Sequence, residues 1–301
     1  MAFRLTASDR TIGVAIRRIA VEQVDKALTA LDSAEQAEAI HEVRVRCKKI
    51  RGLIRLVRPA FPAFPDTNAF FRDIAASLSD LRDAKVMQDT LDTLAAHYAN
   101  RVEREEFVLV RQAFTSSHEE LSAGSALADR LTHCRTHLLA GREQVLGWEL
   151  EADGFEAISG GFAKTYRRAR KAADKAFAGG APEDHHELRK RVKYHWMHAR
   201  LLHPLAPKEM RERAHLAKKL GTLLGEHHDL AVLAERLATL GVHEADPQRV
   251  ALMSKLTSER SKGLSQEAEK MASRLLAEKT GRLVDRVEAL WKPWAKKAGY
   301  P

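Results

Sequence analysis

The 301-residue sequence contains few of the features that hold secreted or membrane proteins together. Its two cysteines, Cys47 and Cys134, lie far apart, which argues against a disulfide framework and favours a reducing compartment. No apolar run approaches the roughly 20 residues that cross a bilayer. The opening stretch MAFRLTASDR has no apolar segment of the kind found in signal peptides. We therefore expect a cytoplasmic protein.

Aromatic residues and strand patterns are also scarce. Phe, Trp and Tyr make up 6% of the chain, and the alternating β-branched residues that mark strands are missing. Ala, Leu, Glu, Arg and Lys dominate, and these residues favour helices. The sequence therefore predicts an all-α fold, with 45% hydrophobic residues to build a core.

Apolar periodicity, together with Pro and Gly punctuation, predicts helices from one end of the chain to the other. In the first half the expected helices cover residues 8–31, 34–57, 67–97 with a break near Asp80, 100–121 and 126–146. In the second half they cover residues 154–177, 183–203, 208–221, 226–240, 247–278 and 281–297.

Two stripes of mainly basic residues are the most informative pattern. Their members recur at steps of three and four, and residues so spaced share one face of a helix. The first stripe is His41, Arg44, Lys48, Arg51, Arg55 and Arg58, and the second stripe is His186, Arg189, Lys193, Trp196, Arg200 and His203. Like charges at this spacing repel by roughly 0.2–0.5 kcal/mol per pair, so we expect a polyanion to neutralise them.

The stripes belong to a repeat of about 145 residues. His-Glu-Val-Arg at 41–44 returns as His-Glu-Leu-Arg at 186–189, and residues 81–86 are echoed by residues 227–232 at nearly the same offset. Two motifs in register predict duplication of a multi-helix unit, with a boundary near residues 147–153. We expect two helical bundles related by a pseudo-twofold axis, one built from residues 1–150 and the other from residues 151–301.

An apolar seam accompanies each stripe. The first seam is Ile40, Val43, Cys47, Ile50, Ile54 and Val57, and the second is Leu188, Val192, His195, Ala199 and Leu202. Each residue of the first stripe follows a seam residue by one position, about 100° around the helix. The stripes should therefore lie at the edge of a buried interface. We expect them to face each other across the joint between the bundles and to line a basic central groove or pore.

Positive charge is concentrated in three segments. Residues 41–58, 164–175 and 186–203 carry net charges of +6, +5 and +4, so the remaining residues carry a net −6, although the whole chain is +9. Segregated positive charge attracts anions. Arg presents a planar fork that matches phosphate oxygens, Lys a compact charge and His a further donor. Phosphate is therefore the expected anion.

Three other interpretations fit less well. An ordinary solvated face should contain interspersed Asp and Glu, yet residues 43–58 contain none. A nucleic-acid-binding helical protein is the main alternative, but the few aromatic residues form no platform on which bases could stack. The basic helices could also touch acidic lipids, although packing within the bundles explains their apolar seams better.

Signatures of catalysis and of metal binding are missing. The chain has no Gly-x-Ser-x-Gly, Walker loop or paired-carboxylate motif, so we expect no enzymatic activity and no cofactor. The adjacent histidines at 227–228 point to different helix faces, and we expect no metal site. His41 and His186 are better interpreted as phosphate donors, or as residues oriented by a carboxylate such as Asp83 or Asp229.

At these residues the sequence resembles the CHAD family, the conserved-histidine α-helical domains. The resemblance rests on His41-x-x-Arg44-x-x-x-Lys48-x-x-Arg51, on His186-x-x-Arg189-x-x-x-Lys193 and on the repeat, and it covers nearly the whole chain. It implies two helical bundles with pseudo-twofold symmetry that bind inorganic polyphosphate through a basic central pore. Some members associate with polyphosphate or storage-polymer granules. Because the Glu-x-Glu-x-Lys signature of a triphosphate-tunnel domain is missing, we expect a stand-alone, non-catalytic member.

The expected polyphosphate site combines both stripes with neighbouring helices. By resemblance, its residues are His41, Arg44, Lys48, Arg51, His186, Arg189 and Lys193. The pattern of charge adds Arg55, Arg200, Arg17, Arg18, Lys164, Arg167, Arg168, Arg170 and Lys171. Trp196 stands where a basic residue would continue the second stripe, so we expect this stripe to bind anions less tightly.

Overall fold

The computed structural model describes residues 3–33, 35–78, 80–103, 106–108, 110, 124–239 and 246–301, and all regular structure within these ranges is helical. The first half contains the 3-10 turn η1 (Ala7–Asp9), α1 (Ile12–Ser33), α2 (Gln36–Leu56), the turn η2 (Arg58–Ala60), α3 (Phe64–Ala76), α4 (Asp80–His97) and α6 (Gly124–Leu146). The second half contains α7 (Gly154–Phe177), α8 (Pro182–Leu201), the turn η4 (His203–Leu205), α9 (Pro207–Thr239), α10 (Pro247–Leu275) and α11 (Thr280–Ala298). The all-α prediction is confirmed. None of the described helices is long and apolar enough to cross a membrane.

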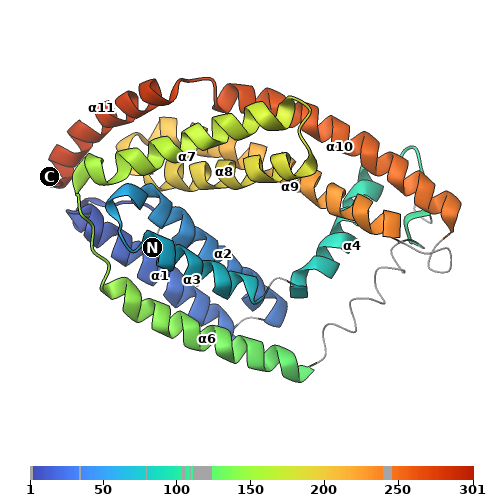
Figure 1. The fold of residues 1–301 in the computed structure, drawn as a ribbon, viewed down its shortest axis with the longest axis horizontal. Helices are drawn as coiled ribbons and strands as arrows, with labels where there is room; N and C mark the ends of the chain where they lie inside the picture. Colours follow the sequence, from blue (N-terminus) through green and yellow to red (C-terminus); the bar gives the residue numbers. More distant parts are fainter. Residues whose placement is uncertain are drawn as a thin grey trace.

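The helices form two groups that meet where α2 lies beside α8 (Figure 1). Figure 1 shows α1, α2, α3 and α6 in one group and α7 to α11 in the other. α4 leaves the first group and packs against α9 and α10. Just beyond α4, Arg101 forms an ion pair with Glu259 of α10, with Nη1 2.6 Å from the carboxylate.

One apolar core extends through both groups. It takes buried residues from α1, α2, α3 and α6 of the first half and from α7 to α11 of the second half. A smaller core joins α4 to α9 and α10 around Leu91, Leu94, Leu233 and Met253. The expected boundary near residues 147–153 therefore falls between two helices, α6 and α7, while the core continues across it.

Asp153 connects the starts of two helices at this boundary. Its Oδ1 accepts a hydrogen bond from the backbone N–H of Gly154 at 2.8 Å and another from that of Ile12 at 2.7 Å. A carboxylate at a helix N-terminus satisfies donors that the helix itself leaves unpaired. Gly154 has a φ of 56°, which favours glycine. A single side chain thus caps α7 and holds the first turn of α1.

The helix boundaries depart from the expected ones in places. The break near Asp80 is confirmed, since α3 ends at Ala76 and α4 begins at Asp80. The expectation of separate helices at 208–221 and 226–240 is wrong, because α9 is continuous over this stretch. Gly221 and Gly225 lie within it and give room to side chains of α8. Most of the expected helix 100–121 lies outside the described residues.

Candidate functional site

The two stripe helices approach each other closely at Gly52. A Cβ on this residue would collide with the side chain of Met197 on α8. Beside it, His198 Nε2–H donates to the Gly52 carbonyl oxygen at 3.1 Å, and both groups are buried. On the neighbouring helix α7, a Cβ on Gly161 would collide with the carbonyl oxygens of Arg55 and Leu56. Glycines therefore allow α2 to pack tightly against α7 and α8, which brings their basic side chains together.

The apolar seams lie in the core, as the sequence predicted. All the seam residues of both stripe helices are at most 6% exposed. In the first stripe, Arg44, Lys48, Arg51 and Arg55 are half-buried while His41 is exposed. The stripes thus lie beside the core, where water screens their charges less than on an open surface.

Basic side chains from three helices gather at the end of α2. We call this set the Arg55 cluster, and it consists of Arg51, Arg55, Arg58, Lys164, Arg168 and Arg191. Burial, and then the charges of Arg51 and Arg191, lowers the pKa of Arg55 to about 10. Glu187 offsets part of this charge by accepting a hydrogen bond from Arg191 Nε at 2.6 Å.

Neighbouring positive charges also lower the pKa values of Lys164 and Arg168, the two α7 members of the Arg55 cluster. The pKa of Lys164 is lowered first by the charge of Arg58 and then by burial. The pKa of Arg168 is lowered first by burial and then by Arg191 and Arg58. Because neighbouring cations disfavour each other's charged form, an anion bound among them would relieve this repulsion.

Part of the first stripe also holds α3 in place. Arg44 Nη1 donates to the carbonyl oxygen of Ala75 at 2.7 Å, in the last turn of α3. A cation is favourable there because the final carbonyls of a helix carry partial negative charge. Arg51 Nε donates to Asn68 Oδ1 at 3.2 Å. These two arginines therefore have structural partners in addition to any ligand.

The second stripe lies against α9. Arg189 Nη1 is 3.9 Å from Asp229 Oδ1, and the Arg189 guanidinium lies over Gly225, where a Cβ would come within 3.1 Å of it. His186 does not pair with Asp229; its ring lies 4.5 Å from that of His228, centroid to centroid. Burial, and then the charge of His228, lowers the pKa of His186 to about 4. His186 is therefore a neutral donor at neutral pH, and the side chain of Asp83 lies outside the described residues.

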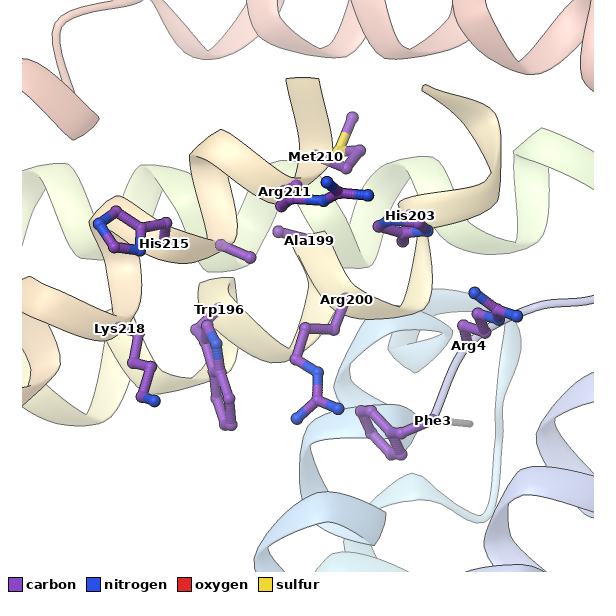
Figure 2. Close-up of a pocket in the computed structure, with 11 residues that line it drawn as sticks. Phe3, Arg4, Trp196, Ala199, Arg200, His203, Met210, Arg211, His215 and Lys218 are labelled. Atoms are coloured by element: carbon purple, nitrogen blue, oxygen red, sulfur yellow. The ribbon is translucent and has the colours of Figure 1, made fainter. Parts of the chain in front are cut away.

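A cavity of about 420 Å³ opens at the other end of α8 (Figure 2). It lies between α8, η4, α9 and the N-terminal segment. Its walls are Phe3, Arg4, Trp196, Ala199, Arg200, His203, Met210, Arg211, Ala214, His215 and Lys218. Figure 2 shows Trp196, Arg200 and Lys218 extending in the same direction from α8 and α9. Among these described lining residues, four carry a permanent positive charge and none is acidic.

Several expected site residues are placed elsewhere. Arg17 Nη1 donates to the Trp148 carbonyl oxygen at 2.6 Å. Arg18 forms ion pairs with Asp9 at 2.5 Å and Glu22 at 2.9 Å. Arg17 and Arg18 thus have polar partners within the protein. Three further residues of α7 are expected to belong to the polyphosphate site. Arg170 is half-buried, whereas Arg167 and Lys171 are exposed.

Sequence reasoning missed five basic residues that the structure brings into these regions, namely Arg4, Arg191, Arg211, His215 and Lys218. Three of them stand at steps of four and three on α9, which is the same signal that revealed the stripes. Spacing could therefore have found Arg211, His215 and Lys218. The N-terminal position of Arg4 gives no periodic signal.

Most of the chain is similar in sequence to known proteins. Residues 15–238 match the sequence profile of the family described as the CHAD domain. Uncharacterized proteins from two strains of Mycobacterium tuberculosis are each 29% identical to this chain over 246 residues. The alignment covers 74% of this chain and 44% of each relative, so the chain matches less than half the length of these proteins.

Proposed function

The chain belongs to the CHAD family, and we propose that it binds inorganic polyphosphate without catalysing a reaction. The observation that carries this proposal is the Arg55 cluster, in which cations of α2, α7 and α8 lie near one another and the pKa values of Arg55, Lys164 and Arg168 are lowered. Such an arrangement costs free energy in the empty protein. A single polyanion would relieve it at several positions together.

The proposal includes an internal duplication, with residues 1–150 and 151–301 forming two related halves. The turns η2 (Arg58–Ala60) and η4 (His203–Leu205) each follow a stripe helix and lie 145 residues apart. Met197, which packs on Gly52, also lies 145 residues from it in the sequence. A residue that contacts its own counterpart lies close to a twofold axis. These spacings support a pseudo-twofold axis between α2 and α8.

Polyphosphate would follow the stripes along a basic groove between these halves. Each phosphate unit can accept from an Arg fork or a Lys ammonium, and charge-assisted bonds of this kind contribute roughly 1.5–3 kcal/mol. We assign the contacts to His41, Arg44, Lys48, Arg51, Arg55, Arg58, Lys164, Arg168, His186, Arg189, Arg191, Lys193 and Arg200. Arg167, Arg170 and Lys171 would extend the positive field along α7.

We place this binding activity in the cytoplasm. Long polyphosphate chains occur in granules, so the proposal includes association with polyphosphate granules. The protein then acts as a binding module, and no residue is assigned to bond making or breaking. The match to less than half of each mycobacterial relative leaves the partners of those longer proteins outside this proposal.

Competition binding at fixed salt tests the proposal. The competitors are long-chain polyphosphate, tripolyphosphate, single-stranded DNA and duplex DNA. We expect long polyphosphate to win by a wide margin, because one flexible chain of dense charge neutralises many cations at once. If DNA binds equally well or better, the ligand is nucleic acid rather than polyphosphate. If all four competitors bind equally and weakly, the protein attracts anions without a specific site.

A further inference from the structure

Trp196 interrupts the second stripe and lines the cavity at the end of α8. The Cζ atom of Arg200 lies 5.0 Å from the centroid of the Trp196 ring. Phe3, Ala199 and Met210 also line the cavity, but each is at most 5% exposed. A bare phosphate chain gains little from the half-buried indole of Trp196. An indole among cations suits a ligand that has an aromatic part as well as negative charge.

Positive charge surrounds this aromatic surface. Arg4, Arg200, Arg211 and Lys218 come from three separate segments, and within the described part of the chain none of them pairs with a carboxylate. His203 also lines the cavity, and its pKa is lowered by burial and then by the charges of Arg4 and Arg211. The walls therefore provide several donors for phosphate and no carboxylate that would repel it.

We propose that this cavity binds a nucleoside polyphosphate, with the base on the Trp196 ring and the phosphates on Arg200, Arg211 and Lys218. Its volume of about 420 Å³ falls within the range of roughly 300–1,000 Å³ that is usual for small-ligand sites. Any nucleobase can stack on an aromatic ring, and a nearby arginine adds a cation–π contribution to the stacking. The inference deepens the proposed function, because Arg200 belongs to the second stripe, but it adds recognition of a base.

The test compares ATP with tripolyphosphate by isothermal titration calorimetry on the full chain. The two ligands carry similar charge, and only ATP has a base. We expect ATP to bind about 5- to 150-fold more tightly, which corresponds to the free energy of stacking one base on an aromatic side chain. Equal affinities would overturn the proposal, and this result needs no variant.

Two variants locate the effect. Trp196→Leu should remove the preference for ATP while tripolyphosphate binding is kept, and Trp196→Phe should retain most of the preference and serves as the folding control. Arg211→Ala/Lys218→Ala should weaken binding of both ligands, whereas Lys279→Ala/Lys296→Ala removes the same charge from exposed positions just before α11 and within it and should change neither affinity. If Trp196→Leu weakens both ligands equally, the indole has only a packing role and the proposal fails.

The same experiments separate this inference from the proposed function. If the protein binds ATP but not long polyphosphate, the nucleotide proposal is supported and the polyphosphate proposal is refuted. If it binds long polyphosphate tightly but shows no preference for ATP over tripolyphosphate, the polyphosphate proposal is supported and the nucleotide proposal is refuted. In that case the cavity holds only part of the phosphate chain.

Discussion

The guanidinium carbon of Arg55 lies 4.1 Å from the centroid of the Tyr194 ring, so a cation of α2 rests on an aromatic side chain of α8. This contact crosses between residues that belong to different halves of the chain. Cation–π attraction grows when both groups are removed from water, and Arg55 is half-buried. The pair therefore holds positive charge at the joint between the two groups of helices despite the repulsion of its neighbours.

The stripe lysines should contribute far more to polyphosphate binding than lysines elsewhere. Lys48 and Lys193 occupy equivalent stripe positions, 145 residues apart in the sequence. Lys48→Ala/Lys193→Ala should weaken binding of long polyphosphate at least tenfold, since each charge-assisted bond contributes roughly 1.5–3 kcal/mol. Fluorescence anisotropy at several salt concentrations measures this, and the salt dependence should become shallower. An equal loss in Lys279→Ala/Lys296→Ala would contradict a specific site.

Close packing of α7 on α2 makes Gly161 sensitive to any side chain. Gly161→Ala places a methyl group against the carbonyl oxygens of Arg55 and Leu56, and we expect destabilisation of roughly 1–3 kcal/mol by overpacking. Gly263 is the matched control, because it lies inside α10 with nothing within 4 Å of an added Cβ. Gly263→Ala should stabilise the protein by about 0.5–1 kcal/mol. Urea unfolding measures the unfolding free energy of both variants. Equal changes in the two variants would refute the close approach of α7 to α2 at Gly161.

Polyphosphate affinity should fall as the pH rises above about 8. Burial, and then the charges of Arg46 and Arg200, lowers the pKa of Lys49 to about 8 in the free protein. The charge of Lys49 interacts with that of Arg200, one of the assigned contacts. A phosphate bound at Arg200 favours the charged form of Lys49, so binding takes up a proton once Lys49 is neutral, and affinity declines from this pKa upward. Binding measured from pH 7 to 9.5 shows the effect. Lys49→Arg should flatten the profile, and an unchanged slope in that variant would assign the effect to another group.

Buried histidines should make the fold sensitive to mild acid. Burial lowers the pKa of His198 to about 3, although its bond to the Gly52 carbonyl opposes the shift. The unfolded chain then binds one more proton than the folded chain between pH 6.5 and 3, so stability is lost as pH falls through this window.

Between pH 7.5 and 5 this histidine alone should remove about 2 kcal/mol of unfolding free energy, as judged from urea unfolding at the two values. His198→Gln keeps a donor for the Gly52 carbonyl and does not titrate. Its stability should therefore change less with pH than that of the unaltered protein. A slope identical in both proteins would show that His198 titrates normally in the folded state.

The sequence by itself determined the helical class, the break near Asp80 and the burial of both seams. These features depend on residues three or four positions apart, and local periodicity fixes which face of a helix they share. Spacing also identified Lys48, Arg55 and Lys193 as stripe members beside the core. Each of these predictions concerns neighbours along the chain, so no knowledge of distant contacts was needed.

Only the tertiary structure decided which partners the cations have within the protein. Arg17 reaches Trp148, and Arg18 pairs with Asp9 although both arginines look like members of a basic wall in the sequence. The cavity around Trp196 needs Phe3 and Arg4 from the other end of the chain. Trp148 lies 131 positions from Arg17, and Phe3 and Arg4 are also far from α8 and α9 in sequence, so no periodic pattern links them. They meet because burial of the shared core brings the helices together.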